Sequence, residues 1–313
     1  MNDLARHVSQ KLGDVLDLSS LSAIPVGAFK TVVADATMPF QIKGKHAKDD
    51  VVLLVSNSDF DGVVEDDIAM AQSVRDIVDG ETGAQIVRPK LSGKWGTQSY
   101  AVFERHHAFS QNRALATFQK VMIAPVLRDW CAQLALQTKQ HWADDDAYDR
   151  RFRAPLRHLV QDHDCPSALR RFAENRLANT RTDQWTCIEH GDLWLGNVLL
   201  TRKFPNPFAP SDFNIRVIDW RGANVQGYPG ADIVRFVRSL CGRPGRLRSK
   251  WVGQILGQYR ATLEMTPTDM AENVALSLGV LGQDLGCFPR DRYCDMRRDT
   301  TGFLRSQGML GDI

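Results

Sequence analysis

The sequence EHGDLWLGNVLL, residues 189–200, carries three polar side chains between two short, mainly apolar runs. One run ends at its first residue and the other lies at its end. Both runs, residues 185–189 and 198–201, have the length and the branched or aromatic content of buried strands. His190, Asp192 and Asn197 occupy the loop between them. A short loop between two buried strands holds its side chains in fixed positions, and this pattern therefore predicts a functional site rather than an ordinary connection.

A further polar group follows a third apolar run. Residues 214–219 read NIRVID, so Asp219 ends a predicted strand. Phosphate transfer from a nucleotide needs one carboxylate to take the proton of the acceptor hydroxyl, and an amide oxygen and a second carboxylate to hold Mg²⁺. Asp192, Asn197 and Asp219 are suitable for these three tasks. Gly-Asp is also common in turns and a single His is more often structural, so the prediction depends on the joint pattern.

The string HGDLWLGN, with IDW downstream, resembles the aminoglycoside phosphotransferase and choline kinase family. The resemblance is strongest over residues 185–240 and only architectural elsewhere. It implies a protein-kinase-like fold in which Asp192 is the catalytic base and Asn197 and Asp219 bind Mg²⁺. It further implies that His190 braces the catalytic loop.

Downstream of these residues, Asp232 lies in the sequence GADI. It resembles the structural aspartate that anchors the catalytic loop in the same family. The N-cap of the following helix is an equally good interpretation, because aspartate is among the preferred N-cap residues.

The chain divides into two parts of different character. Residues 1–105 are rich in short predicted strands, whereas residues 106–313 are mainly helical with a short β insert. We therefore predict an α+β fold of two lobes: a nucleotide-binding lobe with a small antiparallel sheet, and a larger catalytic and acceptor-binding lobe. A cleft between lobes is a common place for a ligand site.

The individual elements follow from the same patterns. Strands are predicted at residues 29–34, 40–45, 51–55, 84–87 and 100–103, with a turn at 91–98. Helices are predicted at residues 63–78, 113–140 with an interruption at Pro125, 155–178, 232–240, 248–263 and 268–285.

The predicted nucleotide-binding lobe departs from the kinase pattern. Kinase-like enzymes carry a lysine on the third strand that contacts the nucleotide phosphates and pairs with an acidic residue of a helix. The third strand here, VVLLV, has no lysine. Lys43 on the preceding strand is the predicted substitute, with Lys45 beside it, and Glu65 or Asp67 is the predicted helix acid. Lysines also decorate solvated edge strands, and acids complement a helix dipole.

Two further segments are candidate nucleotide contacts. The chain has no clean glycine-rich loop, so residues 34–38 are the candidate phosphate cover. The resemblance places residues 103–106 between the lobes, where the backbone would meet the adenine, and it makes Glu104 and His106 nucleotide-binding residues. His106 and His107 are a poor metal pair, because adjacent residues usually point apart and no third ligand is near.

Bulk properties exclude several classes of protein. A net charge of +2 gives no sign of nucleic-acid binding. No apolar run reaches the length of a signal peptide or a membrane span, so a cytoplasmic protein that binds no membrane is expected. The six cysteines are scattered without a C-x-x-C pair, a pattern that fits free thiols in a reducing compartment.

Three functions compete. The favoured one is an ATP-dependent phosphotransferase that moves the γ-phosphate to a hydroxyl of a small molecule: an aminosugar, a sugar or an amino alcohol. The missing third-strand lysine motivates the second, a catalytically inactive kinase-like nucleotide-binding module. A metallohydrolase ranks last, because this region has a single histidine, and a protein kinase is disfavoured because HRD, DFG and APE are absent.

A cationic acceptor would be attracted by acidic residues near the cleft. Residues 144–146 and Asp284 are acidic and could attract a cationic acceptor. Residues 144–146 are interpreted more simply as part of a solvated loop.

Overall fold

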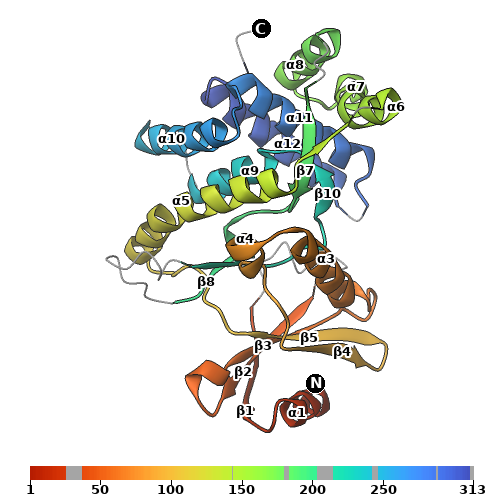
Figure 1. Ribbon diagram of the computed structural model, residues 1–313. Helices are drawn as coiled ribbons and strands as arrows, with labels where there is room; N and C mark the ends of the chain where they lie inside the picture. The colour runs from red at the N-terminus through yellow and green to blue at the C-terminus, as the bar shows by residue number, and fades with distance from the viewer. Residues whose placement is uncertain are drawn as a thin grey trace.

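The computed structural model describes residues 1–25, 37–142, 144–179, 183–202, 214–241, 246–286 and 288–310. A small sheet lies at one end of the molecule and a larger group of helices at the other (Figure 1). Helices α3 (Val63–Ile77) and α4 (Gly80–Ala84) lie between them. The predicted α+β fold, with a small antiparallel sheet and a larger helical part, is confirmed. No helix within the described ranges is long and apolar enough to cross a membrane.

Five antiparallel strands form the sheet, in the order β1-β2-β3-β5-β4. They are β1 (Leu16–Ala23), β2 (Met38–Gly44), β3 (Val51–Val55), β4 (Leu91–Trp95) and β5 (Gln98–Glu104), with the 3₁₀ turn η1 (Ala47–Asp49) before β3. Helix α1 (Asn2–Lys11) packs Leu4, Ala5 and Val8 against one face of this sheet. Alternate residues of β3 are buried in the same core, because successive strand residues point to opposite faces.

Two of the predictions in this region are wrong. Residues 91–98, predicted as a turn, form the edge strand β4 and the tip of its hairpin. The glycine at position 93 lies against the Tyr100 ring, where an added Cβ would come within 3.2 Å, so it marks close packing and not a turn. Residues 84–87, predicted as a strand, begin with the last residue of α4 and form only the isolated bridge between Ile86 and Val217.

One predicted strand and most of one predicted loop cannot be compared with the structure. The strand at residues 29–34 lies outside the described residues, and so do positions 34–36 of the candidate phosphate cover.

The larger part is mainly helical, and helices occur in all the regions expected. They are α5 (Arg113–Gln137), α6 (Asp145–Tyr148), the π-helix η2 (Asp149–Arg153), α7 (Ala154–Gln161), α8 (Ser167–Ala178), α9 (Ala231–Cys241), α10 (Arg246–Thr262), α11 (Pro267–Gln283) and α12 (Arg290–Ser306). Contrary to prediction, α5 continues through Pro125, because Ile123, Ala124 and Leu127 are buried against the core on either side of it. The helix predicted at 155–178 is two helices, separated just before Pro166.

Short strands within the helical part carry the polar loop. β7 (Trp185–Glu189) pairs with β6 (Gln140–His141) and β10 (Asn224–Gly227), and β8 (Val198–Leu200) pairs with β9 (Ile215–Val217). The 3₁₀ turn η3 (Leu195–Asn197) leads directly into β8. The predicted order of strand, polar loop and strand is therefore confirmed.

The buried apolar residues form two separate clusters. The smaller joins α1 to the five-stranded sheet, and the larger fills the helical part. Ala71 and Val74 of α3 belong to the larger cluster, as do Val78 and Ile86, which follow this helix. Helix α3 thus precedes the predicted lobe boundary at residues 105 and 106 in the chain, yet Ala71 and Val74 pack with the helical part.

Candidate active site

Residues 190–197 form the loop that the sequence predicts to be catalytic, here called the catalytic loop. It begins at His190, which is fully buried. The His190 Nε2 atom lies 2.9 Å from the Ile218 carbonyl, and Nδ1 lies 3.3 Å from the N–H of Asp192. Burial lowers the pKa of His190, so the ring is neutral at pH 7. The two partners require a tautomer in which Nε2 donates and Nδ1 accepts. His190 therefore connects the catalytic loop to the strand that leads to Asp219.

Asp232 holds the backbone at the start of the loop. Its Oδ2 accepts the N–H of His190 at 2.6 Å, and its Oδ1 accepts the N–H of Gly191 at 3.1 Å. Burial, together with the charge of nearby Glu189, raises the pKa of Asp232 to about 7, although both N–H groups act in the opposite direction. Asp232 thus contacts the backbone at the start of the loop, as expected from the anchoring role that the sequence resemblance implies.

Gly191 occupies a position where a side chain does not fit. Its φ is +77°, and an added Cβ would lie 2.3 Å from the Gly222 carbonyl oxygen. We expect Gly191→Ala to lower the free energy of unfolding by at least about 1–2 kcal/mol, the cost of the left-handed backbone alone, with the clash adding to it. Urea unfolding of Gly191→Ala measures this loss. Gly302→Ala is the matched control, because no atom lies within 4 Å of an added Cβ there.

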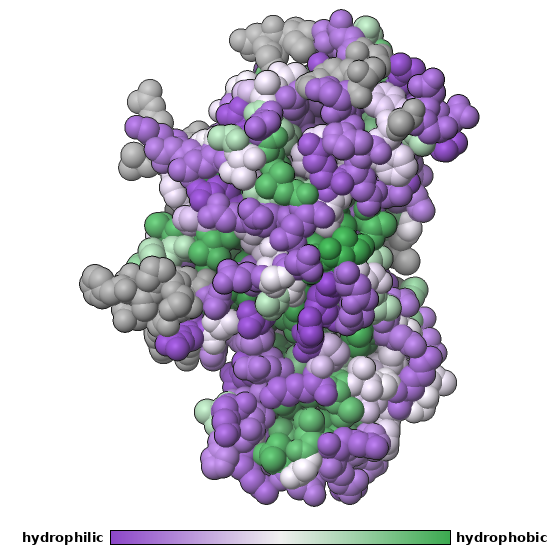
Figure 2. Space-filling view, in the orientation of Figure 1, coloured by the Kyte–Doolittle hydropathy of each residue, from purple (hydrophilic) through white to green (hydrophobic). Residues whose placement is uncertain are grey.

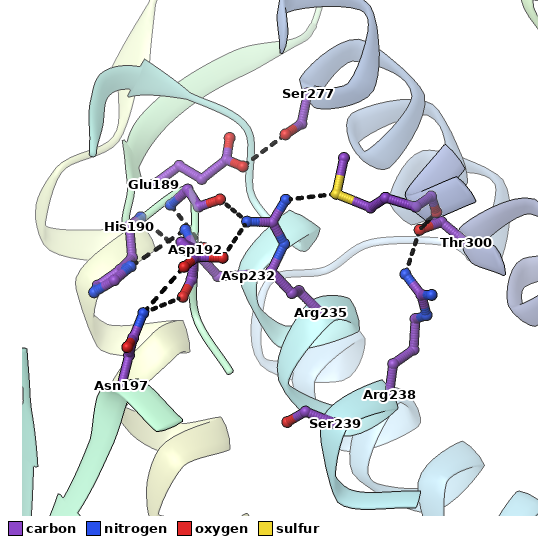
Figure 3. Close-up of polar contacts among 12 residues, drawn as sticks. Glu189, His190, Asp192, Asn197, Asp232, Arg235, Arg238, Ser239, Ser277 and Thr300 are labelled. Atoms are coloured by element: carbon purple, nitrogen blue, oxygen red, sulfur yellow. Dashed lines mark hydrogen bonds and ion pairs between the residues drawn. The ribbon is translucent and has the colours of Figure 1, made fainter. Parts of the chain in front are cut away.

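Asp192 lies at the surface, with its carboxylate held from two sides (Figure 3). Its side chain is 54% exposed, and Oδ1 pairs with Arg235 Nη1 at 3.1 Å. On the other side, Asn197 Nδ2 donates to the Asp192 carbonyl at 2.8 Å and to Oδ2 at 3.2 Å. The carboxylate is thus both accessible and oriented, which a base acting on a bound substrate requires.

The other end of the Asn197 amide is the strongest sign of a metal site. Asn197 is fully buried, and its Oδ1 has no hydrogen-bond partner among the described residues. A buried carbonyl oxygen without a partner is costly, unless a ligand completes it. An amide oxygen is a ligand that Mg²⁺ accepts, so the donor set of Asn197 and Asp219 fits this ion.

Asp219 follows β9 in a left-handed backbone conformation, with φ of +69°. The preceding residue, Ile218, donates its N–H to the Asn197 carbonyl at 3.1 Å, so the two predicted metal ligands lie on adjoining backbone segments. Asp219 also lies close enough to His190 to raise the pKa of that ring against the effect of burial. The structure therefore brings Asp192, Asn197 and Asp219 to one region.

Several features of this region were not predicted. Arg235, on α9, donates from Nη1 to the Gly191 carbonyl as well as pairing with Asp192. Trp194 is 40% exposed beside the loop, with its ring lying over Gly196. A small pocket next to Arg235 is lined by Glu189, Arg238, Ser277, Met296 and Thr300, among others. Figure 3 shows Arg235 between the catalytic loop and α12.

Comparison with known proteins was informative for structures alone. No protein-family model and no curated protein sequence matches the chain. The GDP complex of wild-type aminoglycoside 2'-phosphotransferase-IIIa matches it at 13% identity, over 98% of each chain, with a TM-score of 0.55. The chain has the aminoglycoside phosphotransferase fold.

Two further solved structures with this fold give similar values. A thermostable mutant of aminoglycoside phosphotransferase APH(4)-Ia is 14% identical over 96% of this chain and 98% of its own, with a TM-score of 0.51. A candidate fructosamine-3-kinase from Haemophilus somnus is 11% identical over 95% and 96%, with a TM-score of 0.53. The aminoglycoside phosphotransferase fold is thus shared along nearly the whole chain at low identity.

The predicted nucleotide-binding residues lie on β2, at the end of β5 and in the segment that links the two parts. Lys43 is exposed on β2 and projects from the face opposite Ile42, which is buried in the sheet core. Glu104 ends β5 and is exposed. His106 is half-buried in the segment that links the two parts, and burial lowers its pKa. None of the three is bonded to Asp192 in the part of the chain that the structure describes.

The two candidate helix acids have different partners. Glu65 pairs with Lys94 of β4 at 2.9 Å, and both side chains are largely exposed. Asp67 instead accepts backbone N–H groups from the turn that follows Asp219.

Proposed function

We propose that the protein is an ATP-dependent phosphotransferase that moves the γ-phosphate to a hydroxyl of a small molecule. The Asn197 amide carries this proposal. Its N–H₂ group orients Asp192, while its buried oxygen is left for a ligand. A single side chain thus joins a candidate base to a candidate metal site, the combination that phosphate transfer needs.

Asp192 takes the proton of the acceptor hydroxyl in this proposal. Its exposure allows an acceptor to approach, and Asn197 fixes the carboxylate. Arg235 pairs with the same carboxylate and with the Gly191 carbonyl, so it stabilises the loop conformation that presents the base. Asp232 and His190 support this conformation from beneath without contacting the substrate.

Asn197 and Asp219 hold Mg²⁺ when the nucleotide is bound. The ion neutralises negative charge on the transferred phosphate. Both ligands are anchored by burial. Asn197 is itself fully buried, and Asp219 precedes the fully buried Trp220. This anchoring fixes the two ligand oxygens before the nucleotide arrives.

The acceptor lies over Asp192 in this proposal, between Trp194 and the pocket beside Arg235. Trp194 offers an exposed aromatic face. The pocket is small, and its two hydroxyl groups already have partners. Ser277 donates to Glu189, while Thr300 donates to the Met296 carbonyl and accepts from Arg238. The ring of a sugar acceptor suits the Trp194 face. Two of the acidic candidates have structural contacts: Asp144 caps α6 through the N–H of Ala147, and Asp284 accepts the N–H of Gly286.

The nucleotide lies under the face of the sheet opposite α1. Val52, Leu54 and Phe103 are half-buried on this face and are suitable for an apolar ring.

Lys43 projects on the same side, so we expect Lys43→Ala to raise the KM for ATP several-fold without changing circular dichroism. Unchanged ATP kinetics would assign the role to Lys45, Lys30 or no lysine. Glu104 and His106 complete the proposed site at the linker, where their backbone meets the base.

An inactive nucleotide-binding module is the second candidate, favoured by the lysine-free β3. Thermal shift with Mg-ADP and Mg-ATP tests binding, and a coupled ATP-consumption assay over a library of sugars, aminosugars and amino alcohols tests transfer. Acceptor-dependent consumption of ATP supports the phosphotransferase. Nucleotide binding without turnover across the library supports the inactive module, and no nucleotide binding contradicts both.

A further inference from the structure

Asp67, near the start of α3, makes an unexpected pair of hydrogen bonds. In the kinase pattern this helix supplies a partner for the third-strand lysine, but β3 has no lysine. The Asp67 carboxylate instead accepts two consecutive backbone N–H groups at a single oxygen: Trp220 N–H at 2.5 Å and Arg221 N–H at 3.1 Å. These residues directly follow Asp219.

The turn that receives this bond determines where the Asp219 carboxylate points. Asp219 has a φ of +69°, a conformation that costs free energy in any residue but glycine and needs neighbouring contacts to hold it. Trp220 is fully buried, donates from Nε1 to the Val217 carbonyl at 3.2 Å and packs against the His190 ring at 4.7 Å. These contacts hold the Trp220 side chain, whereas Asp67 holds the backbone N–H groups of the two residues that follow Asp219 in the chain.

Helix α3 is itself fixed relative to β9, so it can hold this turn. Val217 N–H donates to the Gln85 carbonyl at 2.8 Å, and Val87 N–H donates to the Val217 carbonyl at 3.2 Å. Arg75 of α3 donates to the Val87 carbonyl at 2.7 Å. Ala71 and Val74 of α3 are buried in the larger apolar cluster, which also contains Ile215 and Val217 of β9. Figure 1 shows α3 and α4 between the sheet and the helical part.

We infer that Asp67 is a positioning residue for the metal-binding carboxylate Asp219, acting through the backbone of Trp220 and Arg221. Helix α3 thereby supports the metal site through the backbone, by a contact that does not involve a third-strand lysine. This inference rests on the proposed function, because it assigns Asp219 to Mg²⁺. It does not require Asp67 to touch the nucleotide, the metal or the acceptor.

Two variants and a matched control test this role. Asp67→Asn keeps the shape and a weaker acceptor, whereas Asp67→Ala removes the acceptor altogether. Asp66→Asn is the control, because Asp66 is an exposed acid on the same turn of α3 and makes the same change of charge. The first measurement is hydrogen exchange of a peptide covering residues 218–223 in the protein without ligand. The second is calorimetric binding of ADP with and without Mg²⁺.

Both Asp67 variants should exchange the amide protons of residues 220 and 221 faster, with Asp66→Asn unchanged. The gain in ADP affinity that Mg²⁺ brings should fall about tenfold in Asp67→Asn and further in Asp67→Ala, the scale of one charge-assisted hydrogen bond. Binding of ADP without Mg²⁺ should stay as in the native chain, which a general loss of folding would not allow.

Two results would overturn the inference. One is native exchange and native Mg²⁺ dependence in Asp67→Asn and Asp67→Ala. The other is an equal loss of ADP affinity with and without Mg²⁺, which would mean that Asp67 only supports the fold. Failure of the proposed function looks different, because the native chain itself would then bind ADP no better with Mg²⁺.

Discussion

Replacing Asp192 with alanine should reduce phosphate transfer about 10²–10⁴-fold, the range for loss of a general base, and leave the affinity for Mg-ADP nearly native. Asp192 is half exposed, and its partners are Arg235 and Asn197. Removing its carboxylate therefore takes away the proton acceptor while the buried Asn197 oxygen and Asp219 stay in place. A steady-state rate and calorimetric binding of Mg-ADP, after circular dichroism confirms folding, measure the two quantities.

The control for this variant is Glu174→Ala. Glu174 is an exposed acid on α8 and should leave both quantities unchanged. If Asp192→Ala transfers phosphate at the native rate, the loop has no catalytic base and the phosphotransferase proposal loses its mechanism.

Replacing Asp219 with asparagine should have a different outcome, because Asp219 is assigned to the metal and not to the acceptor. We expect the gain in ADP affinity on adding Mg²⁺ to fall sharply, because the amide oxygen that replaces the carboxylate is an uncharged ligand, and phosphate transfer to fall by at least about 10²-fold. Asparagine is the right replacement because it tolerates the left-handed backbone at φ +69°, whereas alanine would add strain. Calorimetry over a Mg²⁺ series and the steady-state rate give both numbers.

Asp219→Asn and Asp192→Ala thus separate binding from chemistry. Native Mg²⁺ dependence in Asp219→Asn would move the metal site elsewhere, even if Asp192 proved essential. An equal loss of metal-free ADP binding would indicate that the substitution had disturbed the fold and not the metal.

The arrangement of residues 190–197 was predictable because it depends on residues close together in the chain. Asp192 and Asn197 lie five positions apart between strands whose apolar pattern is unambiguous, so their proximity follows from the chain itself. Asp219 was predictable for a related reason, since β9 pairs with β8 across a single connection.

The contacts that complete the site were not predictable, because they join residues far apart in the chain. Arg235 lies 43 positions from Asp192, and Asp67 lies 153 positions from Trp220. The sequence left Glu65 and Asp67 equivalent, and only the packing of α3 distinguishes them. Glycines also misled the prediction of β4, because the glycine at position 93 makes room for the Tyr100 ring.

The two apolar clusters have a consequence for how the protein unfolds. Parts of a protein that share few buried contacts can open separately, each with its own free energy. The cluster between α1 and the five-stranded sheet is much the smaller, whereas the segment around Asp219 shares a core with the long helices. The sheet should therefore be the less stable cooperative unit. Because a ligand stabilises only the state that binds it, nucleotide bound under the sheet would protect this unit selectively. Mild heating should then remove the nucleotide site by partial unfolding, while the base and the metal-binding residues remain in their folded positions.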